Sequence, residues 1–155
     1  MRVLGVLLAV LLIAGCGQPP PAPEKFRFTA KTLDGAEFRG EKVVGNPAVL
    51  WFWTPWCPSC NAEAETVAKI ADRHREVQFV GVAAEDQLEA MKKFVADHRM
   101  DGFPHLADLD GSVWKRFGVT AQPTFAFVRV DGAVELLTGA PTEEQLDQRV
   151  TALVP

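Results

Sequence analysis

The sequence predicts an α/β fold with a central mixed β-sheet flanked by helices. A continuous apolar run at residues 48–54 (AVLWFWT) indicates a buried strand, and VQFVGVAA at 77–84 indicates a second one. Between them, residues 58–74 have the pattern of a helix. A strand, a helix and a strand in this order form a βαβ unit, whose two strands run parallel. The 155-residue chain has room for one such domain.

A β-hairpin is expected before this unit. Residues 25–33 alternate apolar and polar side chains, turn at Asp34-Gly35 and continue as a second strand at 36–39. The helix at 58–74 that follows has Glu63 near its start and Arg73 near its end, in keeping with the helix macrodipole.

The second half of the chain predicts a further helix, a hairpin and a last helix. Asp131-Gly132 separates two apolar runs and favours a tight hairpin turn. Thr142 and Gln145 resemble a capping box that begins the last helix. The expected elements are an amphipathic helix at 87–99, a loop with a short helical turn at 113–117, strands at 124–130 and 133–139, and a helix at 142–153.

The stretch WCPSC at residues 56–60 lies where the first buried strand gives way to the helix. Cys57 and Cys60 are three positions apart and can share one reversible disulfide. Cys57 is at the helix entrance, where unpaired N–H groups and the positive end of the macrodipole favour a thiolate. We therefore expect Cys57 to be the nucleophile and Cys60, one turn into the helix, to be the more buried resolving thiol.

The segment FWTPWCPSCNAEA resembles the active site of the thioredoxin superfamily. It is most similar to extracytoplasmic TlpA- and DsbE-like proteins, in particular the actinobacterial DsbE- and DsbF-type (lipo)proteins, and the resemblance runs from about Phe26 to Leu153. It implies the thioredoxin fold, with the N-terminal hairpin typical of TlpA-like proteins and the helix at 87–99 as an inserted element. It also implies a redox-active Cys57–Cys60 disulfide that needs no other cofactor.

The N-terminus has the features of an export signal. Arg2 is followed by VLGVLLAVLLI, which is shorter than the roughly 20 apolar residues that cross a bilayer but suits a signal-peptide core. The apolar stretch is followed by Ala14-Gly15-Cys16, which resembles a lipobox, where the signal is cut before the cysteine, so Cys16 is the expected site of lipidation. The alternative is an ordinary signal peptide with an incidental cysteine. The sequence thus predicts a signal peptide at 1–15.

Residues 16–23 are expected to form a lipidated cysteine and a Pro-rich linker, followed by a thioredoxin-like domain at 24–155. An exported, lipid-anchored protein meets an oxidising compartment outside the cytoplasm. With Cys16 lipidated, Cys57 and Cys60 are the only cysteines left, so their disulfide is free for catalysis. The formal net charge of −4 does not favour nucleic acid as a partner.

Several neighbours of the cysteines are expected to tune the site. Pro58 and Ser59 set the polarity around the Cys57 sulfur. Trp56 offers an apolar rim for a substrate backbone, or else packs at the strand end. The resemblance implies that Pro123 is a cis-proline facing the CxxC and that Gln122, before it, touches the substrate. The alternative is a trans-proline that begins a strand.

One departure from thioredoxin concerns a buried acid. Where thioredoxin has an Asp six residues before its first cysteine, this chain has Trp51. Glu85 or Asp86, after the second strand, could accept the Cys60 proton instead, or could be solvated loop residues. Without a base for Cys60, a reductase would be handicapped more than an oxidase.

A metal site is not expected. CxxC supplies half of a zinc site, but no second Cys or His pair lies at ligand spacing. We expect His74, His98 and His105 to be surface or loop residues.

The sequence therefore predicts a thiol–disulfide oxidoreductase that acts as a disulfide-forming oxidase on exported protein thiols. It would work as a monomer anchored to the membrane by lipid and recharged by a membrane redox partner. The first alternative is a reductase of protein disulfides, for example in apocytochrome c maturation. A peroxiredoxin-like antioxidant is weaker, because Thr54 and Cys57 match TxxC but Leu50 replaces the expected proline. A lipoprotein that binds a partner without catalysis is the remaining alternative.

Overall fold

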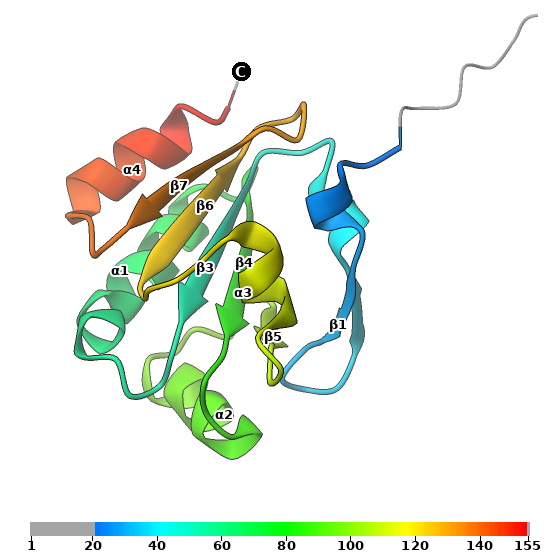
Figure 1. The fold of residues 1–155 in the computed structure, drawn as a ribbon. Coiled ribbons are helices and arrows are strands. Elements are labelled where there is room, and N and C mark those ends of the chain that lie inside the picture. The colour runs from blue at the N-terminus through cyan, green and yellow to red at the C-terminus, as the bar shows by residue number, and fades with distance from the viewer. Residues whose placement is uncertain (1–20, 155) are drawn as a thin grey trace, which may run out of the picture.

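A computed structural model describes residues 21–154, and its centre is a mixed five-stranded sheet (Figure 1). The strand order is β5-β4-β3-β6-β7. The first three strands of that order run parallel, whereas β6 is antiparallel to β3 and β7 is antiparallel to β6. This is the predicted thioredoxin-type arrangement. The strands are β3 (Ala48–Trp53), β4 (Gln78–Ala83), β5 (His105–Ala107), β6 (Thr124–Val128) and β7 (Val134–Thr138).

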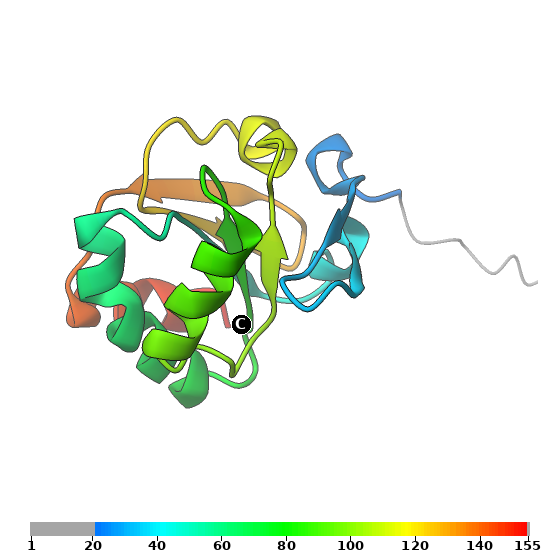
Figure 2. The same ribbon diagram turned by 90° about the horizontal axis from the view of Figure 1, so that it is seen from below.

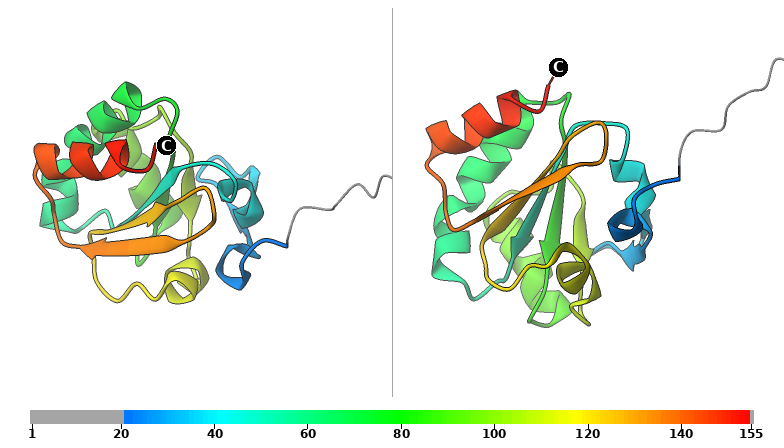
Figure 3. Two further views of the ribbon diagram at one scale, coloured as in Figure 1. Left: turned by 90° about the horizontal axis from the view of Figure 1, so that it is seen from above. Right: turned by 45° about the horizontal axis from the view of Figure 1, so that its top comes forward.

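Helices cover both faces of the sheet (Figures 2 and 3). One face, which we call the α1 face, packs against three helices, and the opposite face, the α3 face, packs against one helix and the N-terminal segment. As predicted, α2 is an additional helix: together with β5 it lies between β4 and α3 in the chain. The helices are α1 (Pro58–Arg73), α2 (Leu88–Asp97) and α4 (Glu143–Thr151) on the α1 face, and α3 (Ser112–Phe117) on the other.

Every residue of the central strand β3 is buried. Side chains alternate along a strand, so Val49, Trp51 and Trp53 point to the α1 face, whereas Leu50 and Phe52 point to the α3 face. A strand covered on both sides must be apolar at every position. This explains the unbroken apolar run from which the strand was predicted.

The predicted N-terminal hairpin is present, but its first strand is shorter than expected. It consists of β1 (Thr29–Lys31) and β2 (Glu37–Arg39). Lys25 and Phe26 were expected to be strand and instead belong to the 3-10 helix η1 (Glu24–Phe26), with Phe26 completely buried. A single buried aromatic side chain fits either an alternating strand or a short helix, which is why the pattern misled here.

The region before α3 was predicted to be a loop, and that prediction was wrong for residues 105–107. They form β5, whose His105 pairs in register with Gly81 of β4. On its other side, the His105 carbonyl accepts a hydrogen bond from the Leu33 backbone N–H at 2.8 Å. Residues 105–107 include no β-branched residue, but backbone pairing with β4 on one side and with Leu33 on the other holds them as a strand.

Two helix caps are well defined. The predicted capping box is confirmed, because Thr142 Oγ1 accepts from the Gln145 backbone N–H at 3.2 Å and Gln145 Oε1 accepts from the Thr142 N–H at 3.0 Å. A second cap was not foreseen: the buried Asp108 carboxylate accepts from the N–H groups of Val113 and Trp114, at 3.0 and 2.8 Å.

The chain enters the described domain beside the β6–β7 turn. A Cβ atom built on Gly132 in that turn would lie 3.1 Å from Pro23 Cγ. The predicted signal peptide and Cys16 lie outside the described residues. Within residues 21–154, the helices are too short and too polar to cross a membrane.

Candidate active site

The two cysteines lie in the turn from β3 to α1, as predicted. Cys57 is the N-cap of α1, and its Sγ accepts a hydrogen bond from the Cys60 backbone N–H at 3.2 Å. Both are free thiols; Cys57 is 4% exposed and Cys60 is completely buried. Burial raises the pKa of the Cys60 thiol, and the neighbouring Cys57 and Glu63 raise it further. Cys60 is therefore held as a thiol, whereas a thiolate at Cys57 would have a backbone donor.

A buried acid lies next to this pair, and the sequence analysis missed it. Glu63 is only 7% exposed, and its Oε1 accepts a hydrogen bond from the Trp51 indole Nε1–H at 2.7 Å. Residues three apart share one face of a helix, so Glu63 and Cys60 are neighbours on α1. Burial raises the pKa of Glu63 to about 7, against the Trp51 hydrogen bond, which lowers it. Thioredoxin has its buried Asp at the position of Trp51. In this chain Glu63 of α1 provides the buried carboxylate instead, and the Trp51 side chain hydrogen-bonds to it.

Two signals in the sequence could have located Glu63. A buried indole N–H requires an acceptor, and Trp51 lies in the middle of a strand predicted to be buried. Glu63 lies one helical turn after Cys60, on the face that must dock onto that strand. Considering the two together would have favoured Glu63 over an acid in a loop.

Neither of the acids that the sequence suggested as proton acceptors for Cys60 is buried. Glu85 is exposed and has a positive φ of 56°. Its backbone carbonyl, rather than its carboxylate, contributes to the site: it accepts a hydrogen bond from the Trp56 Nε1–H at 3.1 Å. The Asp86 carboxylate accepts from the backbone N–H of Gln87 at 2.7 Å. Glu85 and Asp86 therefore fit the alternative reading, solvated acids of the turn after β4.

The residues flanking the cysteines form the surface of the site. Trp56 is 53% exposed, which fits the predicted apolar rim better than packing inside the strand end. Pro58 is the first residue of α1, where its missing N–H costs no hydrogen bond. Pro58 and Ser59 are both exposed beside the buried Cys57.

The Gln122–Pro123 peptide bond is cis, as predicted. Pro123 directly precedes β6, whose first residue, Thr124, pairs with Phe52 near the end of β3. The proline is therefore at the same edge of the sheet as the CxxC turn. We call this edge, where β3, β4 and β5 end and β6 begins, the redox edge.

The histidines correspond only in part to the prediction. His74 and His98 are partly exposed at helix ends and bond to Asp147 and Asn61. His105 was expected on the surface, but it is buried in β5, and burial lowers its pKa to about 4. Among residues 21–154, no three His, Cys, Asp or Glu side chains are grouped so as to bind a metal ion.

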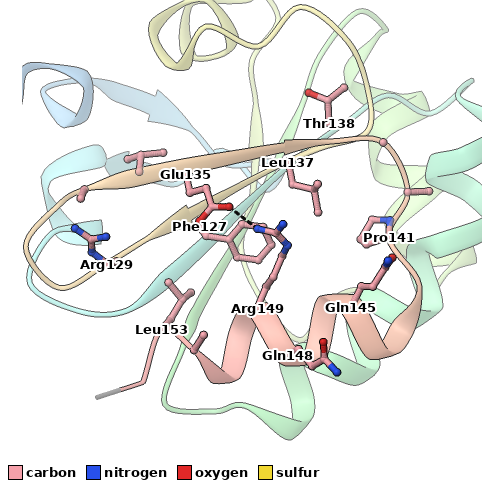
Figure 4. A pocket seen from close by; sticks show the side chains of 15 residues that line it. Phe127, Arg129, Glu135, Leu137, Thr138, Pro141, Gln145, Gln148, Arg149 and Leu153 are labelled. Atoms are coloured by element: carbon pink, nitrogen blue, oxygen red, sulfur yellow. Dashed lines mark hydrogen bonds and ion pairs between the residues drawn. The ribbon is translucent and has the colours of Figure 1, made fainter.

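One pocket lies away from the cysteines, between β7 and α4 (Figure 4). Its volume is about 780 Å³, and Arg149 lies across it, paired with Glu135 at 2.5 Å and 5.6 Å from the centre of the Phe127 ring. A smaller pocket of about 530 Å³ lies at the redox edge. It is lined by Ala84, Glu85, Leu109, Trp114 and Val119, among others. The smaller pocket adjoins the turn whose Glu85 carbonyl accepts a hydrogen bond from Trp56, whereas the larger pocket does not.

Comparisons with known proteins agree with this geometry. The family model described as AhpC/TSA matches residues 21–137. The soluble secreted antigen MPT53 of Mycobacterium tuberculosis is 43% identical over 157 residues, covering 97% of this chain and 90% of MPT53.

Two solved structures are similar throughout the domain. MTB DsbF, in mixed oxidized and reduced forms, is 51% identical, with a TM-score of 0.85 over 86% of this chain and 100% of that one. A secreted Mycobacterium tuberculosis disulfide oxidoreductase homologous to E. coli DsbE is 44% identical, with a TM-score of 0.82 over 85% of this chain and 100% of that one. The chain therefore belongs to the AhpC/TSA family and is a thioredoxin-like thiol–disulfide oxidoreductase of the DsbE/DsbF type.

Proposed function

We propose that this protein is an extracytoplasmic oxidase that introduces disulfides into exported proteins, with Cys57 as the nucleophile. The observation that carries the proposal is the hydrogen bond from the Cys60 backbone N–H to Cys57 Sγ at the start of α1. A donor at this position stabilises the Cys57 thiolate and hence the reduced form of the protein. A disulfide whose reduced form is stabilised is the stronger oxidant.

The reaction would proceed through two exchanges. A substrate thiolate attacks Cys57 Sγ of the Cys57–Cys60 disulfide; the bond between the cysteines breaks and Cys60 leaves as a thiolate. A second substrate thiolate then attacks the substrate sulfur of the mixed disulfide and releases Cys57 as a thiolate. The substrate loses two electrons and gains a disulfide, while the protein gains two electrons and becomes the dithiol.

Glu63 is suited to move the proton at Cys60. With a pKa of about 7, part of the Glu63 population is protonated at neutral pH and can donate to the departing Cys60 thiolate. In the reverse direction, the ionised carboxylate can accept the proton of the Cys60 thiol. Trp51 binds one carboxylate oxygen, and the other, Oε2, is buried without a hydrogen-bond partner among the described residues.

A reductase is the second candidate, and Glu63 is the observation that favours it. The sequence argument for an oxidase rested partly on the missing acid at Trp51, and Glu63 removes that part. A reductase needs Cys60 to lose its proton and resolve the substrate mixed disulfide, which a carboxylate on the same helix face would assist. The direction therefore depends on the reduction potential.

We infer that the substrate binds across the redox edge as an extended polypeptide. Trp56 and Leu109 are both exposed there, the latter at 62%, and the 530 Å³ pocket lies between the turns that follow β4 and β5. Gln122 is partly exposed next to Pro123. Exposed apolar side chains beside a reactive cysteine fit partly unfolded protein substrates rather than small thiols.

The deciding experiment is an equilibrium titration of the Cys57–Cys60 pair in glutathione buffers, followed by tryptophan fluorescence with Cys60→Ser as the control. An oxidase should have a potential of about −120 to −180 mV. A potential of about −270 mV or lower would contradict the oxidase and favour the reductase.

We also propose that the protein is lipid-anchored through Cys16 and recharged by a membrane redox partner. The support is the lipobox-like Ala14-Gly15-Cys16 after a short apolar signal. Expression of the full chain with Cys16→Ala as the control tests the anchor: native protein should partition into detergent and carry a diacylglyceryl mass, and the variant should not. Native protein without that mass would contradict lipidation.

A further inference from the structure

The side chain of Asn61, the residue after Cys60, bonds to the active-site turn. Asn61 Nδ2 donates to the carbonyl oxygen of Pro55 at 3.0 Å and to that of Cys57 at 2.9 Å. The third contact joins Asn61 Oδ1 to His98 Nε2 at 3.1 Å. One side chain thus contacts the carbonyls on both sides of Trp56 and a residue of the inserted helix α2.

These contacts fix the orientation of both side chains. A carbonyl oxygen can only accept, so the Asn61 amide nitrogen must face Pro55 and Cys57. The amide oxygen then faces His98, and the His98 Nε2 must carry a hydrogen and donate it. The reversed amide would place an oxygen about 3 Å from two other oxygens, with no hydrogen between them.

His98 is itself held by the core. It is the C-cap of α2, and its ring centre lies 4.5 Å from that of Phe94. Phe94 stacks on Trp53 of β3, with ring centres 4.3 Å apart. The donor to Asn61 is therefore positioned by packing between α2 and the strand that leads into the CxxC turn.

We propose that Asn61 is a positioning residue for Cys57 and that His98 holds Asn61 in place, so that the inserted helix α2 helps to set the reactivity of the nucleophile. Bonds to the Pro55 and Cys57 carbonyls keep the turn in the conformation in which Cys57 Sγ meets the Cys60 N–H. The Trp56 indole N–H, in the same turn, donates to the backbone carbonyl of Glu85 at 3.1 Å. The inference rests on the proposed role of Cys57 as the nucleophile.

The effect should be moderate, because Asn61 is exposed and its bonds compete with water. Loss of the side chain in Asn61→Ala should slow alkylation of Cys57 by about fivefold at neutral pH. Asn61→Asp should slow it by about tenfold or more, because a carboxylate would face two carbonyl oxygens and add a negative charge beside the thiolate.

The experiment measures the rate of iodoacetamide alkylation of Cys57 in the reduced protein as a function of pH, with the modified residue identified by mass spectrometry. The variants are Asn61→Ala, His98→Phe and the double variant. His98→Phe keeps an aromatic ring against Phe94 but loses the donor, so we expect a two- to fourfold slower rate. In the Asn61→Ala background, the same change should have no further effect.

Two controls separate positioning from a general loss of structure. His98→Gln keeps a side-chain N–H and should restore most of the rate. His74→Phe changes the other C-cap histidine, at the end of α1, and should leave the rate at the wild-type value. Wild-type rates and pH profiles in Asn61→Ala would overturn the inference while leaving the proposed function intact. A wild-type Cys57 no more reactive than an ordinary thiol would instead contradict the proposed nucleophile.

Discussion

Apolar side chains fill most of the α3 face of the sheet, and its buried acid, Asp108, is hydrogen-bonded to the start of α3, whereas the α1 face contains both cysteines together with buried polar atoms that lack a partner among the described residues. On the α3 face, aromatic rings meet edge to face, such as Phe26 with Phe117 at 5.4 Å and Phe52 with Trp114 at 6.0 Å. The α1 face also has stacked aromatics, but Glu63 and His105 are buried among them, and each has one polar atom without a partner.

The difference indicates that the α3 face serves mainly stability, whereas the α1 face also serves reactivity. On the α3 face, buried apolar area and the satisfied hydrogen bonds of Asp108 stabilise the fold. On the α1 face, Glu63 and His105 each lower the stability, since a buried polar atom without a partner costs about 1 to 3 kcal/mol. Burial on this face gives the Glu63 carboxylate, beside Cys60, a pKa near neutrality. Substitutions on the α3 face should therefore change stability, and those on the α1 face should change reactivity and its pH dependence.

The largest expected effect is that of Cys57→Ser. Disulfide exchange should fall by a factor on the order of a thousand or more, because a hydroxyl cannot replace the thiolate. The free energy of unfolding of the reduced protein should change by less than about 1 kcal/mol, since Ser is a good N-cap for α1. Exchange of a dithiol substrate and urea unfolding measure the two quantities. Retained exchange would show that the CxxC is not the reactive site.

Phe26→Ala should have the largest effect on stability. Phe26 is completely buried against Phe117, and removal of such a ring costs about 3 to 5 kcal/mol in the free energy of unfolding. Phe26→Leu, the matched control, should cost about 1 kcal/mol. For both variants, Cys57 alkylation per folded molecule should equal that of the wild type. A slower alkylation would break the proposed separation between the two faces.

Glu63→Gln should change how stability depends on pH. The pKa of Glu63 is raised from 4.5 to about 7 in the fold, so wild-type protein loses stability relative to the variant as pH rises from about 4.5 to 7. The loss should total about 3 kcal/mol and stay constant above that range. Urea unfolding of the reduced proteins between pH 4 and 8 measures it; a constant difference across this range would contradict a buried, titrating Glu63.

His105 changes the pH dependence of stability in the direction opposite to Glu63. Its pKa is lowered from 6.5 to about 4, so its contribution is complete above pH 6.5 and is lost as pH falls toward 4. In wild-type protein the two effects offset each other between about pH 4.5 and 6.5. The same titration should therefore show that Glu63→Gln gains stability with rising pH more steeply than the wild type.

Trp51→Phe should have the smallest effect and tests the Glu63 contact directly. Phe keeps an aromatic ring in the core but removes the indole N–H that lowers the pKa of Glu63. The pKa of Glu63 should therefore rise above 7. The variant should lose about 1 to 2 kcal/mol of stability at pH 8 and less at pH 5, where Glu63 is protonated in both proteins. An equal loss at both pH values would mean that only packing was affected.

Features determined by local sequence were predicted correctly. The βαβ unit, the capping box of Thr142 and the position of Cys57 at the start of α1 each depend on residues close together in the chain. The cis bond before Pro123 was predicted from a family resemblance rather than from the residues themselves. These features could be predicted without knowing how the helices pack on the sheet.

Features that depend on docking were missed. Glu63 and Glu65 both fit the first turns of a helix in solvent, but only Glu63 is turned toward Trp51 once α1 packs on the sheet. His105 is a strand residue only because β4 and Leu33 pair on its two sides. Helical position alone does not distinguish a buried carboxylate from a solvated one; for Glu63 the additional signal was the buried Trp51 indole, which requires an acceptor.

The place where the chain joins the domain has a consequence for any attachment at its N-terminus. Pro23 lies beside Gly132, in the turn that follows β6, whereas Cys57 and Pro123 lie where β6 begins, at the opposite end of the sheet (Figure 1). A protein held from residue 21, by lipid, by a fusion partner or by a coated bead, therefore has its redox edge at the end of the sheet away from the support. Immobilised through its N-terminus, the domain should remain as accessible to large protein substrates as it is in free solution.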